Sequence, residues 1–463
     1  MKPAIILVVL LSGCASLSED GGFSGVQSAT RERMTGEARW IRSGKDAQDA
    51  RSRVQELLAA PLTADSAVQV ALLNNRGLQA TYADLGIAEA DVVQAGRLRN
   101  PGFSIGRSRR GNDVEVEWTF LIDVLGLITL PARSDLERRR FGLAQTEVAS
   151  ETLRVAAETR RAYLRAVAAQ EGARYSAQVN EVAAASAELA RRMAAAGNFS
   201  KLDQAREQVF YAEATAHLAR ARQGALSERE RLTHLMGLWG EDIAFRLPDR
   251  LPDLPGAARE EVDIESRAMK QRLDVQASLR SAESIAASLG LTKATGYVSV
   301  LELGYTRTRE TGQPLKTGYA IEIRLPIFDW GQARNARAES TYMQAVNRAA
   351  DVAVRARSEV REAHAAYRTT FELARHYRDE VVPLRKRISE ENLLRYNGML
   401  IGVFELLADA RQQVAAVNAY IESLRDFWVA DSNLTLALTG RSPGTQVISA
   451  GTVLPTGGAP EGH

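Results

Sequence analysis

Apolar residues recur at helical spacing over two long stretches, about 134–196 and 333–397. One face of the first stretch gathers Leu153, Ala156, Ala157, Leu164 and Val167. Pro383 is the only proline in either stretch. About sixty residues at 1.5 Å each make a helix of roughly 90 Å, which is longer than one compact domain needs. Helical spacing returns after Gly197 and Gly402 and lasts to about residues 235 and 438.

Ahead of each long stretch the spacing of apolar residues shortens to two, which predicts strands. The first pair covers 102–109 and 113–121, with a hairpin turn at Gly111-Asn112. The second pair covers about 297–308 and a strand near 319–325. The predicted apolar faces carry Val114, Val116, Trp118 and Phe120 in one strand and Tyr319, Ile321, Ile323 and Leu325 in another. The opposite faces carry Asp113, Glu115, Glu117 and Thr119, and then Ala320, Glu322 and Arg324.

A helix is predicted before each strand pair. The first begins at a cap, Asp65 or Ser66, and continues to about residue 97, where Asn100-Pro101 stops it. The second covers about 263–293. The order helix, strand, strand, helix therefore occurs twice along the chain.

A sequence repeat supports this duplication. The segments 197–209 and 402–414 share seven of thirteen residues at a constant offset of 205. Their common residues are Gly, Phe, Leu, Ala, Arg, Gln and Val. The two repeats cover about 61–255 and 256–442, and Pro248, Pro252 and Pro255 lie at the join. The segment 443–463 is rich in Gly and Pro and is predicted to be disordered.

The N-terminus has the pattern of an export signal. Lys2 is followed by a short apolar run from Ala4 to Leu11, too short to span a bilayer. Residues 1–13 are therefore interpreted as a signal peptide. The following Leu-Ser-Gly-Cys resembles the bacterial lipobox, which implies lipidation of Cys14, the one cysteine of the chain. An ordinary signal peptide with an incidental cysteine is the alternative. Residues 14–60 would form a lipid-anchored arm with some helix near Val54–Leu58.

Composition excludes several classes of function. The chain has 463 residues, a net charge of +2 and five histidines without metal-site spacing. No common nucleotide-binding, zinc-protease or serine-hydrolase motif occurs. We therefore expect neither an enzyme, nor a cofactor, nor a metal site, nor binding to nucleic acid.

Four strands cannot close a sheet by themselves, and open edges are not tolerated in lipid. Three chains would supply twelve strands, enough to close a transmembrane β-barrel. The expected fold is mainly α with a small β part, in which each chain adds four β-strands to a trimeric 12-stranded barrel. Its lumen would then carry Glu115, Glu117, Glu322 and Arg324. A half-buried sheet in a soluble protein would show the same alternation.

Several segments together resemble the TolC-like outer-membrane efflux channels. These are the lipobox, the duplicated unit, the Gly-containing turns before "LxxAR", the opening segment 71–80, and Leu325-Pro326-Ile327-Phe328-Asp329-Trp330-Gly331. The resemblance covers about 61–442. It implies a homotrimer in the outer membrane, extended into the periplasm by a long α-helical barrel. It also implies a passive exit duct for a periplasmic adaptor protein and an inner-membrane pump. Ala15 after the cysteine, by resemblance to bacterial lipoproteins, favours the outer membrane.

The resemblance also suggests functional residues. The helix-to-helix turns would dock the adaptor through Gly197, Phe199, Leu202 and Arg206, and through Gly402, Phe404, Leu407 and Arg411. Asp409 matches an acidic residue that narrows the pore in the family, whereas Leu406 stands where a second acid is common. Glu405 is the nearest substitute. Alternatively, Asp409 is a solvated residue or a partner of Arg411.

A second function class is a lipid-anchored periplasmic adaptor or coiled-coil scaffold. Such a protein normally has one helical hairpin flanked by β-domains, whereas this sequence predicts two hairpins interrupted by strand pairs.

Overall fold

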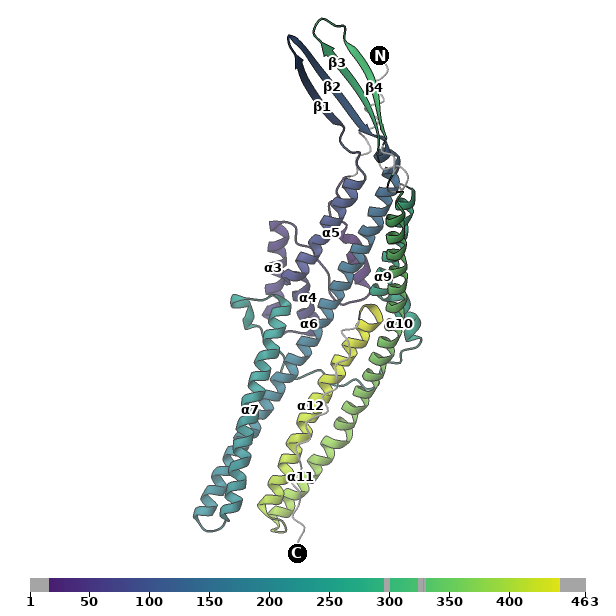
Figure 1. Cartoon of the computed structure of the whole chain (residues 1–463). Helices are drawn as coiled ribbons and strands as arrows, with labels where there is room; N and C mark the ends of the chain where they lie inside the picture. The colour runs from purple at the N-terminus through teal and green to yellow at the C-terminus, as the bar shows by residue number, and fades with distance from the viewer. Residues whose placement is uncertain (1–15, 295–299, 324–327, 329, 442–463) are drawn as a thin grey trace. The chain divides into compact units, whose positions relative to one another are not determined.

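The computed structural model describes residues 16–294, 300–323, 328 and 330–441, except for the side chains of 403 and 404. Its regular structure is one small sheet and a set of mostly long helices (Figure 1). The residues form two compact units. The first holds the described parts of Met1–Ala29, Ala80–Glu151 and Leu273–Arg355, and the second those of Thr30–Gln79, Thr152–Arg272 and Ala356–His463. Each sequence repeat contributes to both units.

The sheet lies in the first unit and contains four antiparallel strands in the order β1-β2-β3-β4. They are β1 (Gly102–Arg110), β2 (Asp113–Asp123), β3 (Leu301–Glu310) and β4 (Lys316–Ile323). Strands β2 and β3 pair with Phe120 opposite Tyr305, so the two repeats meet inside one sheet. The first strand pair agrees closely with the sequence prediction. Residues 297–299 and 324–325 of the second predicted pair lie outside the described residues.

The helices before the strands are each broken once, which the sequence did not predict. The first is divided into α4 (Ala64–Asn74) and α5 (Arg76–Ala95), and the second into α8 (Ile264–Gln271) and α9 (Leu273–Ala294). Asn75 and Arg272 lie at the breaks with similar extended backbones, at φ −67°, ψ 112° and φ −67°, ψ 125°. Thr63, and not Asp65 or Ser66, is the N-cap of α4, because its hydroxyl accepts the Ser66 N–H at 3.1 Å.

The two breaks have one structural reason, which lies within the second unit. The Asn75 amide donates to the Leu235 carbonyl at 2.8 Å, and the Arg272 guanidinium donates to the Ala437 carbonyl at 3.1 Å. These carbonyls lie near the ends of α7 (Lys201–Met236) and α12 (Val403–Thr439). The last carbonyls of a helix have no partner within it, so each break residue supplies a hydrogen bond to a helix end. Beside the first break, a Cβ at Gly237 would lie 2.6 Å from the Asn74 carbonyl oxygen.

The long helices match the prediction with shifted bounds. Helix α6 covers Val124–Ala195, so it begins ten residues before the predicted start and includes Pro131. The second long stretch is α10 (Gln332–His376), a π-helical turn at Tyr377–Val381, and α11 (Val382–Asn397). Pro383 lies two residues after this turn and has no N–H to donate, which explains a local change of hydrogen-bond pattern here. No helix of the described ranges combines the length and the apolar character needed to cross a membrane.

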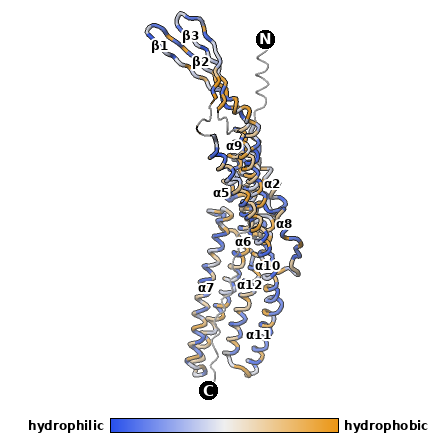
Figure 2. Tube along the Cα trace, turned by 45° about the vertical axis from the view of Figure 1, so that its right-hand side comes forward, coloured by the Kyte–Doolittle hydropathy of each residue, from blue (hydrophilic) through white to orange (hydrophobic). Residues whose placement is uncertain are grey.

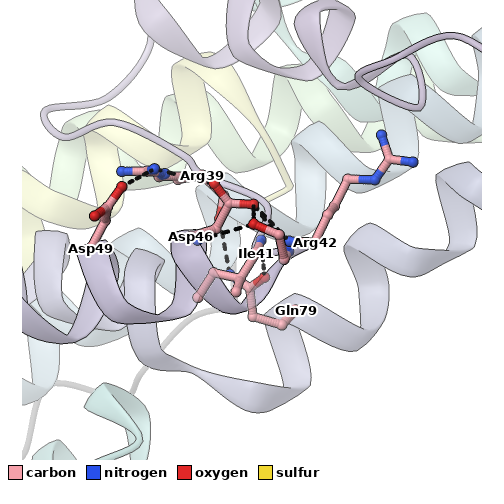
Figure 3. A network of polar contacts seen from close by, with 7 residues as sticks. Arg39, Ile41, Arg42, Asp46, Asp49 and Gln79 are labelled. Atoms are coloured by element: carbon pink, nitrogen blue, oxygen red, sulfur yellow. Dashed lines mark hydrogen bonds and ion pairs between the residues drawn. The ribbon is translucent and has the colours of Figure 1, made fainter.

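The predicted N-terminal arm contains more helix than the sequence indicated. Within its described residues, 16–60, it forms α2 (Phe23–Arg31) and α3 (Gly44–Ala59). Figure 3 shows how its second part is held: Gln79 accepts the Ile41 N–H at 2.9 Å and donates to the Arg39 carbonyl at 2.9 Å. Arg39 also pairs with Asp46 at 3.4 Å. Helix α3 buries only Ala50 and Val54. Its sequence therefore has few apolar residues at helical spacing, which is why the sequence pattern did not predict the whole helix.

The core of the second unit gathers aromatic residues from several helices. The Phe427 ring lies 5.6 Å from those of Tyr367 and Phe371, and 5.0 Å from that of Trp428. The hydroxyl of buried Tyr163 donates to the Leu62 carbonyl at 3.0 Å. Burial raises the pKa of Tyr163 to about 12.

Candidate functional site

The first helix-to-helix turn joins α6 to α7 (Figure 1). Gly197 has a φ of 80°, and its N–H donates to the Ala194 carbonyl at 3.1 Å. The Asn198 N–H donates to the Met193 carbonyl at 2.9 Å, as in a helix that ends on glycine. A Cβ at 197 would meet no described atom within 4 Å. The left-handed dihedral angle, and not space, therefore favours glycine here.

Beyond this turn, Ser200 is the N-cap of α7, and its hydroxyl accepts the Asp203 N–H at 3.1 Å. Arg206 pairs with Asp203 at 3.3 Å on the surface. The predicted docking residue Leu202 is 61% exposed, and Phe199 is half-buried.

An acidic residue pairs with two arginines near the end of α6 at this turn. Glu188 accepts hydrogen bonds from Arg191 and Arg192 at 2.7–2.8 Å. These bonds lower the pKa of Glu188 to about 2. The carboxylate is therefore ionised at neutral pH.

The second turn joins α11 to α12 at residues 398–402 and has a different backbone. Here Met399 has the left-handed φ of 58°, whereas Gly402 is the N-cap of α12 with a φ of −80°. Gly197 and Gly402 coincide in the sequence repeat, yet one ends a helix and the other begins one. Met399 and Leu400 are 93% and 75% exposed at this turn.

An ion pair with a buried carboxylate joins the two helical hairpins close to these turns. The carboxylate of Glu207 in α7 accepts from Arg411 of α12 at 3.2 Å and from Ser186 of α6 at 2.8 Å. The Glu207 side chain is only 2% exposed. The Arg411 guanidinium also lies 4.2 Å from the centre of the Phe210 ring. Sequence reasoning missed Glu207, because its counterpart in the repeat is Gln412, so no acidic residue recurs there.

The two acidic residues suggested to narrow the pore, Asp409 and Glu405, lie in different environments. Asp409 is 6% exposed in the single chain, and its Oδ2 has no hydrogen-bond partner among the described residues. Arg411 pairs with Glu207 rather than with Asp409. Glu405 is exposed in the first turn of α12, and Leu407 is half-buried. The side chain of Phe404 lies outside the described residues.

The register of the sheet separates two faces. Trp118, Phe120 and Ile321 share one face, while Glu115, Glu117 and Glu322 share the other and are exposed in the single chain. Figure 2 shows that the hairpin tips are mostly hydrophilic and that the strand ends that join helices are more hydrophobic. Arg324 and Cys14 lie outside the described residues. No group of three or more metal-binding side chains occurs in the part of the chain that the structure describes.

Comparison with known proteins relates the chain to outer-membrane channels. No protein-family model matches it. It is 26% identical over 280 residues to the cobalt-zinc-cadmium resistance protein CzcC of Cupriavidus metallidurans, an alignment that spans 59% of this chain and 65% of that protein. CzcC is named as a resistance protein and VceC of Vibrio cholerae as an outer-membrane protein, in agreement with the prediction that the chain is not an enzyme.

Solved structures extend the likeness to most of the chain. The outer-membrane protein VceC of Vibrio cholerae superimposes with a TM-score of 0.68 at 16% identity, over 86% of this chain and 99% of VceC. The open-state outer-membrane channel MtrE of Neisseria gonorrhoeae gives a TM-score of 0.67 at 17% identity, over 84% and 89% of the two chains. This chain therefore has the fold of the TolC-like outer-membrane channels, and its predicted resemblance to that family is confirmed.

Proposed function

We propose that the chain forms the homotrimeric outer-membrane exit channel of a tripartite efflux pump. The observation that carries the proposal is the four-stranded amphipathic sheet, in which β1 and β4 are edge strands. Unpaired backbone groups of an edge strand are costly in lipid. Strand β1 runs antiparallel to β4, so neighbouring chains can pair these edges and close a twelve-stranded sheet.

In this assembly the two faces of the sheet meet different surroundings. The acidic face would line a water-filled passage with Glu115, Glu117 and Glu322, joined by Arg324. The aromatic and aliphatic face would contact lipid. The long helices would continue the passage through the periplasm to an adaptor protein and an inner-membrane pump, with passive conduction.

Membrane fractionation, together with a measurement of the mass of the detergent-solubilised protein, tests this proposal. The full-length protein should be recovered in the outer membrane as a trimer that conducts ions in planar bilayers. Ile105→Lys places a charge on the apolar face and should abolish recovery of the trimer. The control Ser104→Lys adds the same charge to the adjacent position on the other face and should leave the trimer intact with altered ion selectivity. Recovery as an inner-membrane protein would instead favour the adaptor alternative.

The two turns are the proposed docking sites for the adaptor. Exposed apolar side chains support this, among them Leu202, Met399 and Leu400. Apolar side chains exposed together at a helix end are typical of a binding surface. Glu405 and Asp409 are the proposed constriction, because three copies of an acidic residue near one turn would narrow the passage and attract cations.

Single-channel conductance separates the two acidic candidates. Glu405 is exposed in the single chain, so Glu405→Ala should raise conductance and weaken block by divalent cations if Glu405 forms the ring. Asp409→Ala should raise conductance and weaken this block only if the Asp409 side chain points into the passage in the trimer. Unchanged conductance and block in both variants would reject a constriction at these residues.

We further propose that Cys14 is lipidated and anchors the chain in the outer membrane. Metabolic labelling with palmitate should mark the wild-type protein and not Cys14→Ser.

The similarity to a cobalt-zinc-cadmium resistance protein supports a pump that exports divalent metal ions. Deletion of the gene should then sensitise cells to zinc, cobalt or cadmium; sensitivity to organic compounds alone would exclude that cargo.

A further inference from the structure

The apolar face of the sheet changes character along its length. Near the strand ends that join helices it carries aromatic and aliphatic side chains. Near the hairpin turns it carries arginines instead, among them Arg107 in β1 and Arg307 and Arg309 in β3. The register places Val116 of β2 opposite both Arg107 and Arg309, and Trp118 opposite Arg307. Directly opposed residues point to the same side of a sheet, so these three arginines share the face of Trp118.

A cavity of about 540 Å³ lies over this part of the face. Its lining includes the aromatic residues Phe103, Trp118, Phe120 and Tyr305, with Arg307 and Arg309 at the hairpin end. Phe103 and Tyr305 are 65% and 42% exposed, so the aromatic surface is open to a ligand. An apolar floor with cationic groups at one end suits an amphiphile with an anionic head.

The arginines are not neutralised within the described part of the chain. Arg107, Arg307 and Arg309 make no ion pair with any described residue. The acidic residues nearest in register, Glu115 and Glu117, alternate with Val116 and therefore lie on the opposite face. Guanidinium groups on a lipid-facing surface need anionic partners at the level of the headgroups.

We propose that this groove binds a phosphorylated lipid of the outer leaflet. Arg307 and Arg309 would hold the phosphate through paired N–H donors, for which the planar guanidinium is well shaped. An acyl chain would lie along Trp118 and the neighbouring rings. The inference rests on the proposed placement of the sheet in the outer membrane, with the hairpin turns on the side away from the helices.

Native mass spectrometry of the full-length trimer in detergent tests the proposal, with lipid A as the probe. Arg307→Gln/Arg309→Gln should weaken lipid A binding by about tenfold or more, because charge-assisted hydrogen bonds to phosphate are lost. The control Arg110→Gln/Lys316→Gln removes two positive charges near the same turns from the opposite face. It should bind lipid A as the wild type does. Dephosphorylated lipid A should bind the wild type as weakly as lipid A binds the first double variant.

Several results would overturn the inference. These are unchanged affinity in Arg307→Gln/Arg309→Gln, equal loss in the control variant, or displacement of lipid A by inorganic phosphate at equal concentration. The last would show that the aromatic floor contributes nothing. Trimer mass and channel conductance are measured on the same samples. If wild type and variants all form conducting trimers but bind lipid A alike, the lipid site alone fails. If the wild type forms no outer-membrane trimer, the proposed function fails first.

Discussion

The two helix-to-helix turns carry the same sequence motif and yet differ in backbone and in bonding. In the first, Gly197 ends a helix in the left-handed conformation and Ser200 caps the next one. In the second, Met399 takes the left-handed conformation, and α12 begins at Val403 immediately after Gly402. Relative to the motif, α12 starts three residues earlier than α7, because Lys201 at the start of α7 corresponds to Leu406. The shared motif therefore locates a turn without determining its geometry.

The two arginines that coincide in the motif, Arg206 and Arg411, also differ in the partners they bind. Arg206 pairs with Asp203 of its own helix at the surface. Arg411 reaches Glu207 of another hairpin, and that carboxylate is almost fully buried. Duplication of a sequence has thus produced one local contact and one contact that joins distant segments.

The largest expected difference in unfolding free energy is the one between replacing Arg411 and replacing Arg206. Arg411→Ala leaves the buried Glu207 carboxylate with Ser186 as its one remaining partner among the described residues, and should cost about 3 kcal/mol of unfolding free energy. Arg206→Ala removes an exposed pair and should cost about 0.5 kcal/mol or less. Urea unfolding followed by the helical circular dichroism signal measures both. Equal losses would show that the buried pair is not what holds the hairpins together.

A smaller difference in unfolding free energy is expected between replacing Gly197 and replacing Gly402. Gly197→Ala forces a side chain into the left-handed region and should cost about 1–2 kcal/mol. Gly402→Ala keeps an ordinary extended backbone with no described atom near the new Cβ, so its effect should stay within about 0.5 kcal/mol. The same urea titration compares them. A larger loss at 402 would contradict the different roles assigned to the two glycines.

The smallest effect concerns the two helix starts. Ser200→Ala removes the N-cap hydrogen bond of α7 and should cost about 1 kcal/mol. Its counterpart in the motif, Glu405, contributes only a charge near the start of α12, so Glu405→Ala should cost about 0.3 kcal/mol. Ser200→Thr keeps a hydroxyl and serves as the control. If it destabilises as much as Ser200→Ala does, the hydroxyl is not acting as a cap.

Sequence reasoning located most of the local structure because local patterns carry it. The period of two in 113–121 predicted β2 and its faces, and the long 3.6-residue period predicted α6 and α10. The repeat at 197 and 402 located both turns. The same reasoning missed the helix breaks at Asn75 and Arg272, because their cause is a hydrogen bond to a helix end more than 150 residues away.

By itself, the sequence determined the duplicated order of helices and strands, the alternation along each strand and the positions of the turns. These follow from propensity and periodicity over a few neighbouring residues. Only the tertiary structure decided that β2 pairs with β3, that Glu207 meets Arg411, and that Asp409 is buried in the single chain. Each joins or covers residues far apart in sequence, and such contacts depend on how complete elements pack, which no local pattern records.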